Sequence, residues 1–286
     1  MSDLLTTVPA ARAFCEAARA RGAAVGLVPT MGALHDGHRS LLRQSLAQND
    51  VTVVSIFVNP LQFGAGEDLE AYPRGFENDL RICAGEGAAA VFAPSEAEMY
   101  PQPPVTSLDF GGLSASLEGA CRPGHLAGVG LVVAKLFAIV GACRAYFGEK
   151  DWQQLAVVRR LADDLSLPVD VVGCPTVRQP DGVALSSRNA YLGADERAAA
   201  GVLHRCLLAG AALIEAGERA SAVVEAAMAS VLAAEPLLGR VDYARVVDAA
   251  TLARREPLRG ELRLLVAAHL GGTRLIDNLG ATVPPP

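Results

Sequence analysis

The sequence predicts an α/β protein, in which a Rossmann-like, doubly wound parallel sheet is followed by a smaller α+β domain. Short apolar runs of strand length alternate with helical patterns over the first 180 residues, as in parallel sheets with helices on their faces. The first such run ends in a turn rich in glycine and histidine that leads into a helix. After residue 180 the alternation stops, and Ala-rich helical sequence is followed by strand patterns alone. We therefore expect domains at 1–180 and 181–286.

The individual elements follow from their patterns. Residues 4–22 carry apolar side chains at helical intervals and end at Arg21-Gly22, which predicts a helix. Apolar and β-branched runs predict buried strands at 23–28, 51–58, 88–94, 145–147 and 169–172, and helical spacing predicts helices at 40–46, 76–87, 128–140 and 152–165. Residues 95–124 are rich in Pro, Gly and Ser and predict irregular or short-strand structure. In the second domain, two helices separated near Gly217 are expected over 194–234, with strands at 241–248, 262–270 and 274–278.

Composition and charge exclude several classes of protein. Apolar residues make up 51% of the 286, too many for a disordered chain. The net charge of −6 leaves no basic footprint for nucleic acid. No apolar run reaches about 18 residues and the first residues lack a signal-peptide pattern, so we expect a cytoplasmic protein without a membrane span. The six cysteines stand singly, which indicates neither a zinc site nor a disulfide framework.

The turn at 29–39 is the leading candidate for a ligand site. Glycines let a phosphate approach the backbone, and the unpaired N–H groups at a helix N-terminus bind anions. His35 and His38 share one face if the helix begins near Asp36. The positive end of a helix disfavours an imidazolium, so we expect neutral imidazoles that donate N–H to phosphate oxygens. The alternatives are a metal half-site and a purely structural histidine pair.

Two polar loops extend this candidate site. Ligands of a doubly wound sheet bind beyond the carboxyl ends of its strands, where the histidine turn, Asn59 and Gln62 all fall. The loop 175–189 brings Arg, Ser, Ser and Arg into a region with little helix or strand pattern. It suggests a mobile loop that handles phosphate, and the alternative is a hydrophilic surface turn.

Four blocks of sequence together resemble one family, the pantoate–β-alanine ligases or pantothenate synthetases. The blocks are Pro29–His38, Phe57–Gly64 with Tyr72-Pro73-Arg74, Phe147–Leu155 and Leu185–Asn189, and Arg274–Asn278 resembles the family's last strand. The resemblance keeps order and spacing over nearly the whole chain. It implies a fold of the nucleotidyltransferase type, shared with class I aminoacyl-tRNA synthetases, in which His35–His38 resembles the HIGH motif and Leu185–Arg188 the KMSKS motif.

The resemblance also implies a reaction. It is the ATP-dependent condensation of (R)-pantoate with β-alanine to pantothenate, a step toward vitamin B5 and coenzyme A. The reaction passes through an enzyme-bound pantoyl adenylate, releases AMP and diphosphate, and uses Mg²⁺. A homodimer is implied as well, with no nucleic-acid or membrane partner.

Site residues carry over by resemblance, position by position. The implied catalytic residues are His35, His38, Lys150, Ser186, Ser187 and Arg188. The implied ATP-binding residues are Pro29, Thr30, Met31, Gly32, Ala33, Leu34, His35, Asp36, Gly37, His38, Gly148, Glu149, Lys150, Asp151, Val177, Leu185, Ser186, Ser187 and Arg188. Asn59, Gln62 and Gln154 would hold pantoate and β-alanine, because amides can satisfy both hydroxyl and carboxylate groups.

The chain departs from the family pattern at few positions. Gln179 stands where the family more often has Glu, and Leu126 follows His125 where an aromatic is usual. Asn78-Asp79 falls where members often carry paired acidic residues, which makes Asp79 the one magnesium candidate. Arg122 is expected near the substrate or a dimer contact.

Three other kinds of protein share features with this sequence. Another small nucleotidyltransferase would share the histidine element but would not be expected to keep the Gln62 and Gln154 pair. A nucleotide-sensing module on the same fold would bind ATP without turnover. A dinucleotide oxidoreductase is disfavoured, because no G-x-G-x-x-G follows a strand.

Overall fold

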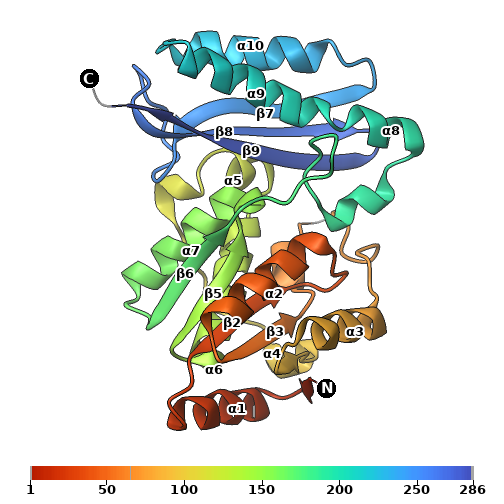
Figure 1. Cartoon of the computed structure of the whole chain (residues 1–286), viewed down its shortest axis with the longest axis vertical. Coiled ribbons are helices and arrows are strands. Elements are labelled where there is room, and N and C mark those ends of the chain that lie inside the picture. The colour runs from red at the N-terminus through yellow and green to blue at the C-terminus, as the bar shows by residue number, and fades with distance from the viewer. Residues whose placement is uncertain (1, 65, 285–286) are drawn as a thin grey trace. The chain divides into compact units, whose positions relative to one another are not determined.

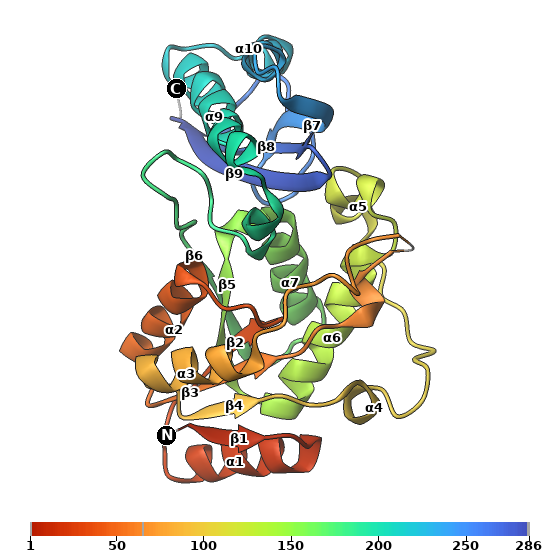
Figure 2. The same ribbon diagram turned by 90° about the vertical axis from the view of Figure 1, so that its right-hand side faces the viewer.

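The structure is a computed structural model that describes residues 2–64 and 66–284 (Figures 1 and 2). The chain forms two compact units. The sheet unit comprises Met1–Phe110, Glu118–Glu149 and Val157–Pro175, and the C-terminal unit comprises Gly111–Leu117, Lys150–Ala156 and Thr176–Pro286. The last crossing between the units thus falls slightly before the boundary expected at 180/181, and two short segments from earlier in the chain join the C-terminal unit.

Six parallel strands form the centre of the sheet unit. They are β1 (Asp3–Leu5), β2 (Val25–Thr30), β3 (Val51–Ile56), β4 (Ala90–Phe92), β5 (Cys143–Gly148) and β6 (Val169–Cys174), in the order β1-β4-β3-β2-β5-β6. The chain leaves β2 toward β3 and β4 and later returns to β5 on the other side of β2. In such sheets, ligands bind where the strand order reverses, so the turns after β2 and β5 are the expected place.

Helices cover both faces of this sheet, as expected for a doubly wound fold. They are α1 (Val8–Ala20), α2 (Asp36–Gln48), α3 (Phe76–Glu86), α4 (Glu96–Met99), α5 (Glu118–Cys121), α6 (His125–Val140) and α7 (Trp152–Asp164), the last of which crosses into both units. Figure 2 shows α2 and α6 on opposite sides of the strands. Leu41 and Leu42 of α2 and Ile82 of α3 pack with Val28 and Val54 of the sheet, and α1 contacts α6.

Two regional expectations need correction. The helix expected over 4–22 begins at Val8, and Asp3–Leu5 is an edge strand that pairs in parallel with β4. Thr7 caps this helix and Pro9 stands in its first turn, so the helix cannot extend back into the apolar residues before it. Residues 95–124 are irregular over much of their length, as expected, and the short elements among them are helices and not strands.

The C-terminal unit is a three-stranded antiparallel sheet with helices on one face. Its strands are β7 (Leu238–Asp248), β8 (Gly260–Leu270) and β9 (Thr273–Val283), in sequence order. Its helices are α8 (Ala194–Ala199), α9 (Val202–Glu215) and α10 (Ser221–Ala233), one break more than the two helices expected. Leu207 of α9 and Met228 of α10 pack on Leu264 of β8, and the opposite face of the sheet carries a second apolar cluster that includes Tyr243 and Leu265.

One helical stretch, Ala194–Glu215, has the length and hydropathy of a membrane span, and it is the only one in the described part of the chain. Of its most apolar window, 56% is buried inside the structure. Its side chains Leu203, Cys206 and Leu207 belong to the apolar core of the C-terminal unit. Buried core helices of globular domains can have the same length and hydropathy, so we assign this stretch to the core of the C-terminal unit.

A substitution at Gly26 provides a test of how α2 packs on the sheet. A Cβ at this position of β2 would overlap Ser45 Oγ and lie 2.7 Å from Asn49 Nδ2. Neither side chain can move freely, because Ser45 bonds to Thr52 and Asn49 bonds to Tyr146. We expect Gly26→Ala to lower the free energy of unfolding by about 1–3 kcal/mol, measured by urea denaturation.

The matched control is Gly85→Ala on α3, where an added Cβ meets nothing within 4 Å. This substitution should leave stability unchanged or raise it by up to about 1 kcal/mol, since alanine is the better helix former. Equal unfolding midpoints for the two variants would contradict the packing argument.

Candidate active site

The turn between β2 and α2 has a conformation that requires glycine. Gly32 and Ala33 follow one another with φ of 83° and 50°, in the left-handed region. Thr30 Oγ1 accepts the N–H of Gly32 at 3.2 Å and donates to the carbonyl of Ser55 at 2.8 Å. The turn is thereby tied to both β2 and β3, and it leads directly into α2.

Asp79 of α3 holds this turn from the side. Its two carboxylate oxygens accept the N–H groups of Ala33 at 2.9 Å and Leu34 at 2.8 Å, and the residue is 1% exposed. A Cβ on Gly32 would lie 2.9 Å from Asp79 Oδ2. Burial raises the pKa of Asp79, and the two N–H donors oppose that rise. The carboxylate therefore shapes the turn between β2 and α2.

Asp79, the magnesium candidate, thus uses both carboxylate oxygens to accept backbone N–H groups. Within residues 2–64 and 66–284, no group of three or more His, Cys, Asp or Glu side chains could hold a metal ion. The donor set around Asp79 does not fit a protein cage for Mg²⁺, which takes oxygen ligands in near-octahedral geometry.

His35 and His38 cap α2 with their own rings. His35 is the N-cap residue, and its Nδ1 accepts the N–H of Gly37 at 3.1 Å. His38 Nδ1 accepts the N–H of His35 at 3.2 Å, and the two ring centroids are 4.1 Å apart. A ring nitrogen that accepts a backbone N–H carries no proton, so in both neutral rings the proton lies on Nε2. The fold thereby selects the tautomer with an Nε2–H donor at the positive end of the helix.

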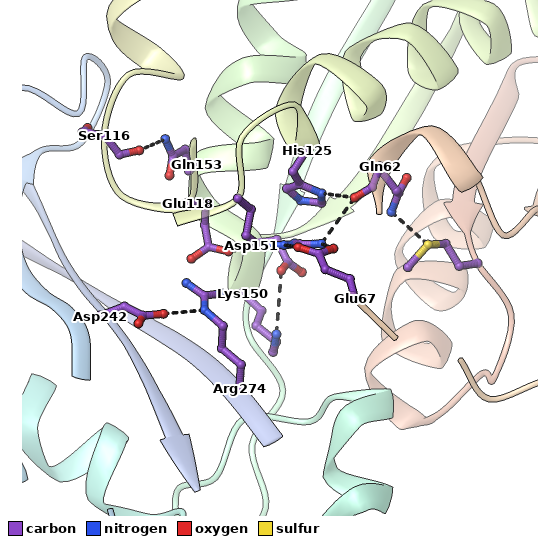
Figure 3. A network of polar contacts seen from close by, with 12 residues as sticks. Gln62, Glu67, Ser116, Glu118, His125, Lys150, Asp151, Gln153, Asp242 and Arg274 are labelled. Atoms are coloured by element: carbon purple, nitrogen blue, oxygen red, sulfur yellow. Dashed lines mark hydrogen bonds and ion pairs between the residues drawn. The ribbon is translucent and has the colours of Figure 1, made fainter. Parts of the chain in front are cut away.

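A network of amides surrounds Gln62, which lies in the short turn η1 (Pro60–Gln62). Asn59 is 1% exposed, and its Nδ2 donates to Gln62 Oε1 at 3.2 Å and to the carbonyl of Gly128 at 3.1 Å. Its Oδ1 accepts the hydroxyl of Tyr100 at 2.9 Å. With its oxygen facing Asn59, Gln62 directs Nε2 toward Met31 Sδ, 2.9 Å away (Figure 3). The amide of Asn59 is thus used inside the protein, and it orients Gln62.

The backbone of Gln62 is held from α6 and the segment before it. His125 Nδ1 lies 2.8 Å from the carbonyl oxygen of Gln62 (Figure 3), and Arg122 donates to the same oxygen at 3.4 Å. Burial lowers the pKa of His125, and the nearby guanidinium of Arg122 lowers it further. Arg122 also forms a two-bonded ion pair with Glu67 at 2.6 and 2.8 Å, and this hydrogen bonding lowers the pKa of Glu67 to about 2. Arg122, expected near substrate or a dimer contact, thus supports the Gln62 turn.

A second set of expected site residues lies in the C-terminal unit, at the start of α7. Lys150 Nζ is 3.7 Å from Asp151 Oδ1, and the lysine side chain is 18% exposed. Of the two adjacent glutamines, Gln153 is buried and donates to the carbonyls of Leu113 and Ser116 (Figure 3). Gln154 is half-buried and makes no side-chain hydrogen bond to any residue that the structure describes. The resemblance had pointed to Gln154, and its side chain is the one not committed to the fold.

The loop 175–189 contains a small hairpin. Arg178 bridges Ala184, and Leu185 donates its N–H to the carbonyl of Val177 at 2.9 Å. Ser186 then caps the short helix η4 (Ser187–Tyr191) by accepting the N–H of Arg188 at 3.3 Å. The hairpin therefore leads directly into Ser186, Ser187 and Arg188, and the loop has more regular structure than the sequence pattern indicated.

The structure assigns the expected site residues to both units. The sheet unit carries Pro29–His38, Asn59, Gln62, Asp79, Gly148 and Glu149, and the C-terminal unit carries Lys150, Asp151, Gln154, Val177 and Leu185–Arg188. Tyr100, Arg178 and Asn278 have supporting roles that the sequence pattern did not indicate. Each acts through a contact with a residue distant in sequence, which no local pattern announces.

Comparisons with known proteins cover nearly the whole chain, including the candidate site residues. The family model for pantoate-beta-alanine ligase matches residues 3–280. The pantothenate synthetase of Moorella thermoacetica is 51% identical over 277 residues, which cover 97% of this chain and 98% of that protein. The crystal structure of pantothenate synthetase from Thermus thermophilus has a TM-score of 0.91 at 46% identity, with 97% and 98% of the two chains covered.

A pantoate-beta-alanine ligase from Francisella tularensis, described as complexed with beta-gamma ATP and beta-alanine, has a TM-score of 0.79 at 30% identity. It covers 98% of this chain and 97% of its own. These matches run through both units and include every block that carries the resemblance in the sequence. The chain belongs to the pantoate–β-alanine ligase family.

Proposed function

We propose that this chain is a pantothenate synthetase, which condenses pantoate with β-alanine through a pantoyl adenylate and converts ATP to AMP and diphosphate. The observation that carries the proposal is that the family model matches residues 3–280 and that a pantothenate synthetase is 51% identical over 277 residues. The geometry of the α2 N-terminus supports it, because two neutral imidazoles whose N–H donor is Nε2 stand at the positive end of the helix.

The first step attacks the α-phosphorus of ATP with the pantoate carboxylate. A carboxylate is a nucleophile at neutral pH, so this step needs alignment and stabilisation of phosphate charge, and no general base. We assign His38 and His35 to the reacting phosphate, and Lys150, Ser186, Ser187 and Arg188 to the departing diphosphate. Charge-assisted donors of this kind form the stronger hydrogen bonds. Gly148, Asp151 and Val177 are assigned to the nucleoside.

Pantoate offers a carboxylate and two hydroxyl groups, which amides can bind as donors and acceptors. We assign Gln62 and Gln154 to direct contact. Asn59 is assigned to the same substrate indirectly, because its amide is bonded inside the protein and sets the direction of Gln62. This refines the expectation that Asn59 itself holds substrate.

In the second step, the amine of β-alanine attacks the acyl adenylate and AMP leaves. The mixed anhydride must be protected from water until the amine arrives. We assign this protection to the C-terminal domain, which would act as a lid. Gln62 and Gln154 would retain the pantoyl group during the exchange of ligands.

The family resemblance also supports proposals about magnesium, cellular location and oligomeric state. Magnesium would arrive with the ATP phosphates and water, because Asp79 is committed to the turn and forms no cage. The enzyme would act in the cytoplasm as a homodimer.

The test of the proposed function is ATP–diphosphate isotope exchange with Mg²⁺ and pantoate but without β-alanine. Exchange that requires pantoate would show a reversible acyl-adenylate step, and adding β-alanine should then yield pantothenate and AMP. Products that appear only with β-alanine would indicate a concerted route. No turnover under either condition would reject the proposal in favour of a nucleotide-sensing module or another transferase.

His38→Ala should lower the pantoate-dependent exchange rate by about 10²–10³, because it removes one preorganised donor to the reacting phosphate. His38→Gln should retain part of the rate. A glutamine at this helix position can accept the N–H of residue 35 and still donate from Nε2. Circular dichroism checks that both variants fold, and exchange within about threefold of wild type for His38→Ala would remove His38 from this role.

Tyr100→Phe should raise the pantoate KM by about 3–10-fold and leave the ATP KM unchanged, because one hydrogen bond that fixes Asn59 is lost. Burial raises the pKa of Tyr100 to about 12, so its hydroxyl remains a donor over the working pH range. Steady-state kinetics with each substrate varied in turn measures the two KM values.

Tyr146→Phe is the matched control for Tyr100→Phe. Tyr146 also has a buried hydroxyl bonded to an asparagine, Asn49, but this residue follows the C-terminal end of α2. The histidines stand at the other end of that helix, about 20 Å away. Tyr146→Phe should lower stability without changing either KM. A pantoate KM that responds equally to both substitutions would contradict the assignment.

A further inference from the structure

Two neighbouring residues of β9 contact both segments to which the proposed function assigns the diphosphate. Asp277 and Asn278 are 4% and 2% exposed. Asn278 contacts the backbone of Lys150, and Asp277 contacts Arg178 in the hairpin before Ser186. All of these residues belong to the C-terminal unit. Neither buried side chain is placed to meet solvent, so a direct contact with ATP does not explain them.

Asn278 is held in one orientation. Its Nδ2 donates to the backbone carbonyl of Lys150 at 2.7 Å, and its Oδ1 accepts from Arg263 Nε at 2.6 Å. Arg263 can only donate, so the amide nitrogen of Asn278 must face Lys150. The guanidinium of Arg263 lies 3.6 Å from the ring centroid of Trp152, two residues after Lys150 in the chain. The start of α7 is therefore fixed to β8 and β9 at two points.

Asp277 fixes the other segment. Its carboxylate accepts two hydrogen bonds from Arg178, at 2.6 and 2.9 Å. Arg178 also donates to the carbonyls of Gly182 at 3.0 Å and Asn278 at 3.1 Å. Such a paired guanidinium–carboxylate contact restricts both distance and orientation. The hairpin that leads to Ser186, Ser187 and Arg188 is thus attached one residue from the point that holds Lys150.

We propose that Asn278 is a positioning residue for Lys150, and that β9 holds Lys150 and Ser186–Arg188 in a fixed register as one phosphate-binding unit. The inference rests on the proposed function, which gives these cations and hydroxyls their ligand. Asp277 Oδ1 also accepts the N–H of Asn278 at 2.7 Å, so the two attachments share one short piece of backbone. A displacement of about 1 Å in such a group can reduce a rate about 10²-fold.

Asn278→Asp is the informative variant. The new carboxylate keeps the size of the side chain and gains an opposite charge for Arg263, so we expect the fold to be retained. It loses the donation to Lys150 and places an oxygen against that carbonyl. The ATP KM in pantoate-dependent exchange should rise about tenfold, the cost of one buried hydrogen bond, while the pantoate KM stays at the wild-type value.

A double-mutant cycle separates positioning from a general structural effect. If Asn278 acts through Lys150, Asn278→Asp should change kcat/KM for ATP by less than about twofold in a Lys150→Ala background. An equal loss in both backgrounds would overturn the inference. Should Asn278→Asp fail to fold by circular dichroism, Asn278→Ala replaces it, with the same non-additivity expected.

Ser221→Ala is the control for the loss of a buried hydrogen bond elsewhere in the C-terminal unit. Ser221 is 0% exposed at the start of α10, and its hydroxyl donates to Glu256 and accepts from Arg254 at 3.2 Å. Its substitution should lower the unfolding midpoint in urea and leave the ATP KM unchanged. A rise in the ATP KM equal to that of Asn278→Asp would make the effect of Asn278 non-specific and overturn the inference.

Calorimetric titration with ATP distinguishes failure of this inference from failure of the proposed function. Wild-type binding without turnover, whether or not β-alanine is present, would reject the proposed reaction, and the cycle would then be run on Kd values. Wild-type exchange with an unchanged Asn278→Asp variant would reject the positioning role alone. A wild type that neither binds ATP nor exchanges would reject both.

Discussion

The buried carboxylate of Asp79 is the constraint on which the candidate site depends. Two consecutive residues of the turn between β2 and α2, Gly32 and Ala33, have left-handed backbone conformations, which cost free energy in the absence of compensation. Asp79 supplies it by accepting two N–H groups that would otherwise be buried without partners. The path of the turn then decides where α2 begins, and with it where both histidines stand.

The same helix start determines the chemistry that the histidines can perform. Because both Nδ1 atoms accept backbone N–H groups, the N–H donor of each ring is at Nε2. The fold itself orients these donors, so they would need little reorganisation at the reacting phosphate to which we assign them. A capping interaction that stabilises the helix therefore also orients the ring nitrogens that we assign to the reacting phosphate.

Much of the fold and the centre of the site could be predicted from local sequence. The alternation of strands and helices and the glycine–histidine turn are periodic or contiguous signals, and the structure confirms the α/β fold that they indicate. Asp3–Leu5 was missed because three residues are too few to show a period. The contacts of Asp79, Tyr100 and Asn278 join residues tens of positions apart, so they depend on the completed fold and leave no local pattern.

Two asparagines show why residue type matters at such positions. In Asn59 the amide oxygen accepts from the backbone N–H of Leu61 at 3.4 Å, and in Asn278 it accepts from the guanidinium of Arg263; both of these groups can only donate. The amide nitrogen is then directed at the oxygen of Gln62 in one case and of Lys150 in the other. Aspartate could accept but not donate, and glutamine would add a rotatable bond. A donor-only group thus sets the orientation of each asparagine, and the asparagine in turn holds a second residue in place. In both cases that second residue, Gln62 or Lys150, is one assigned to a substrate.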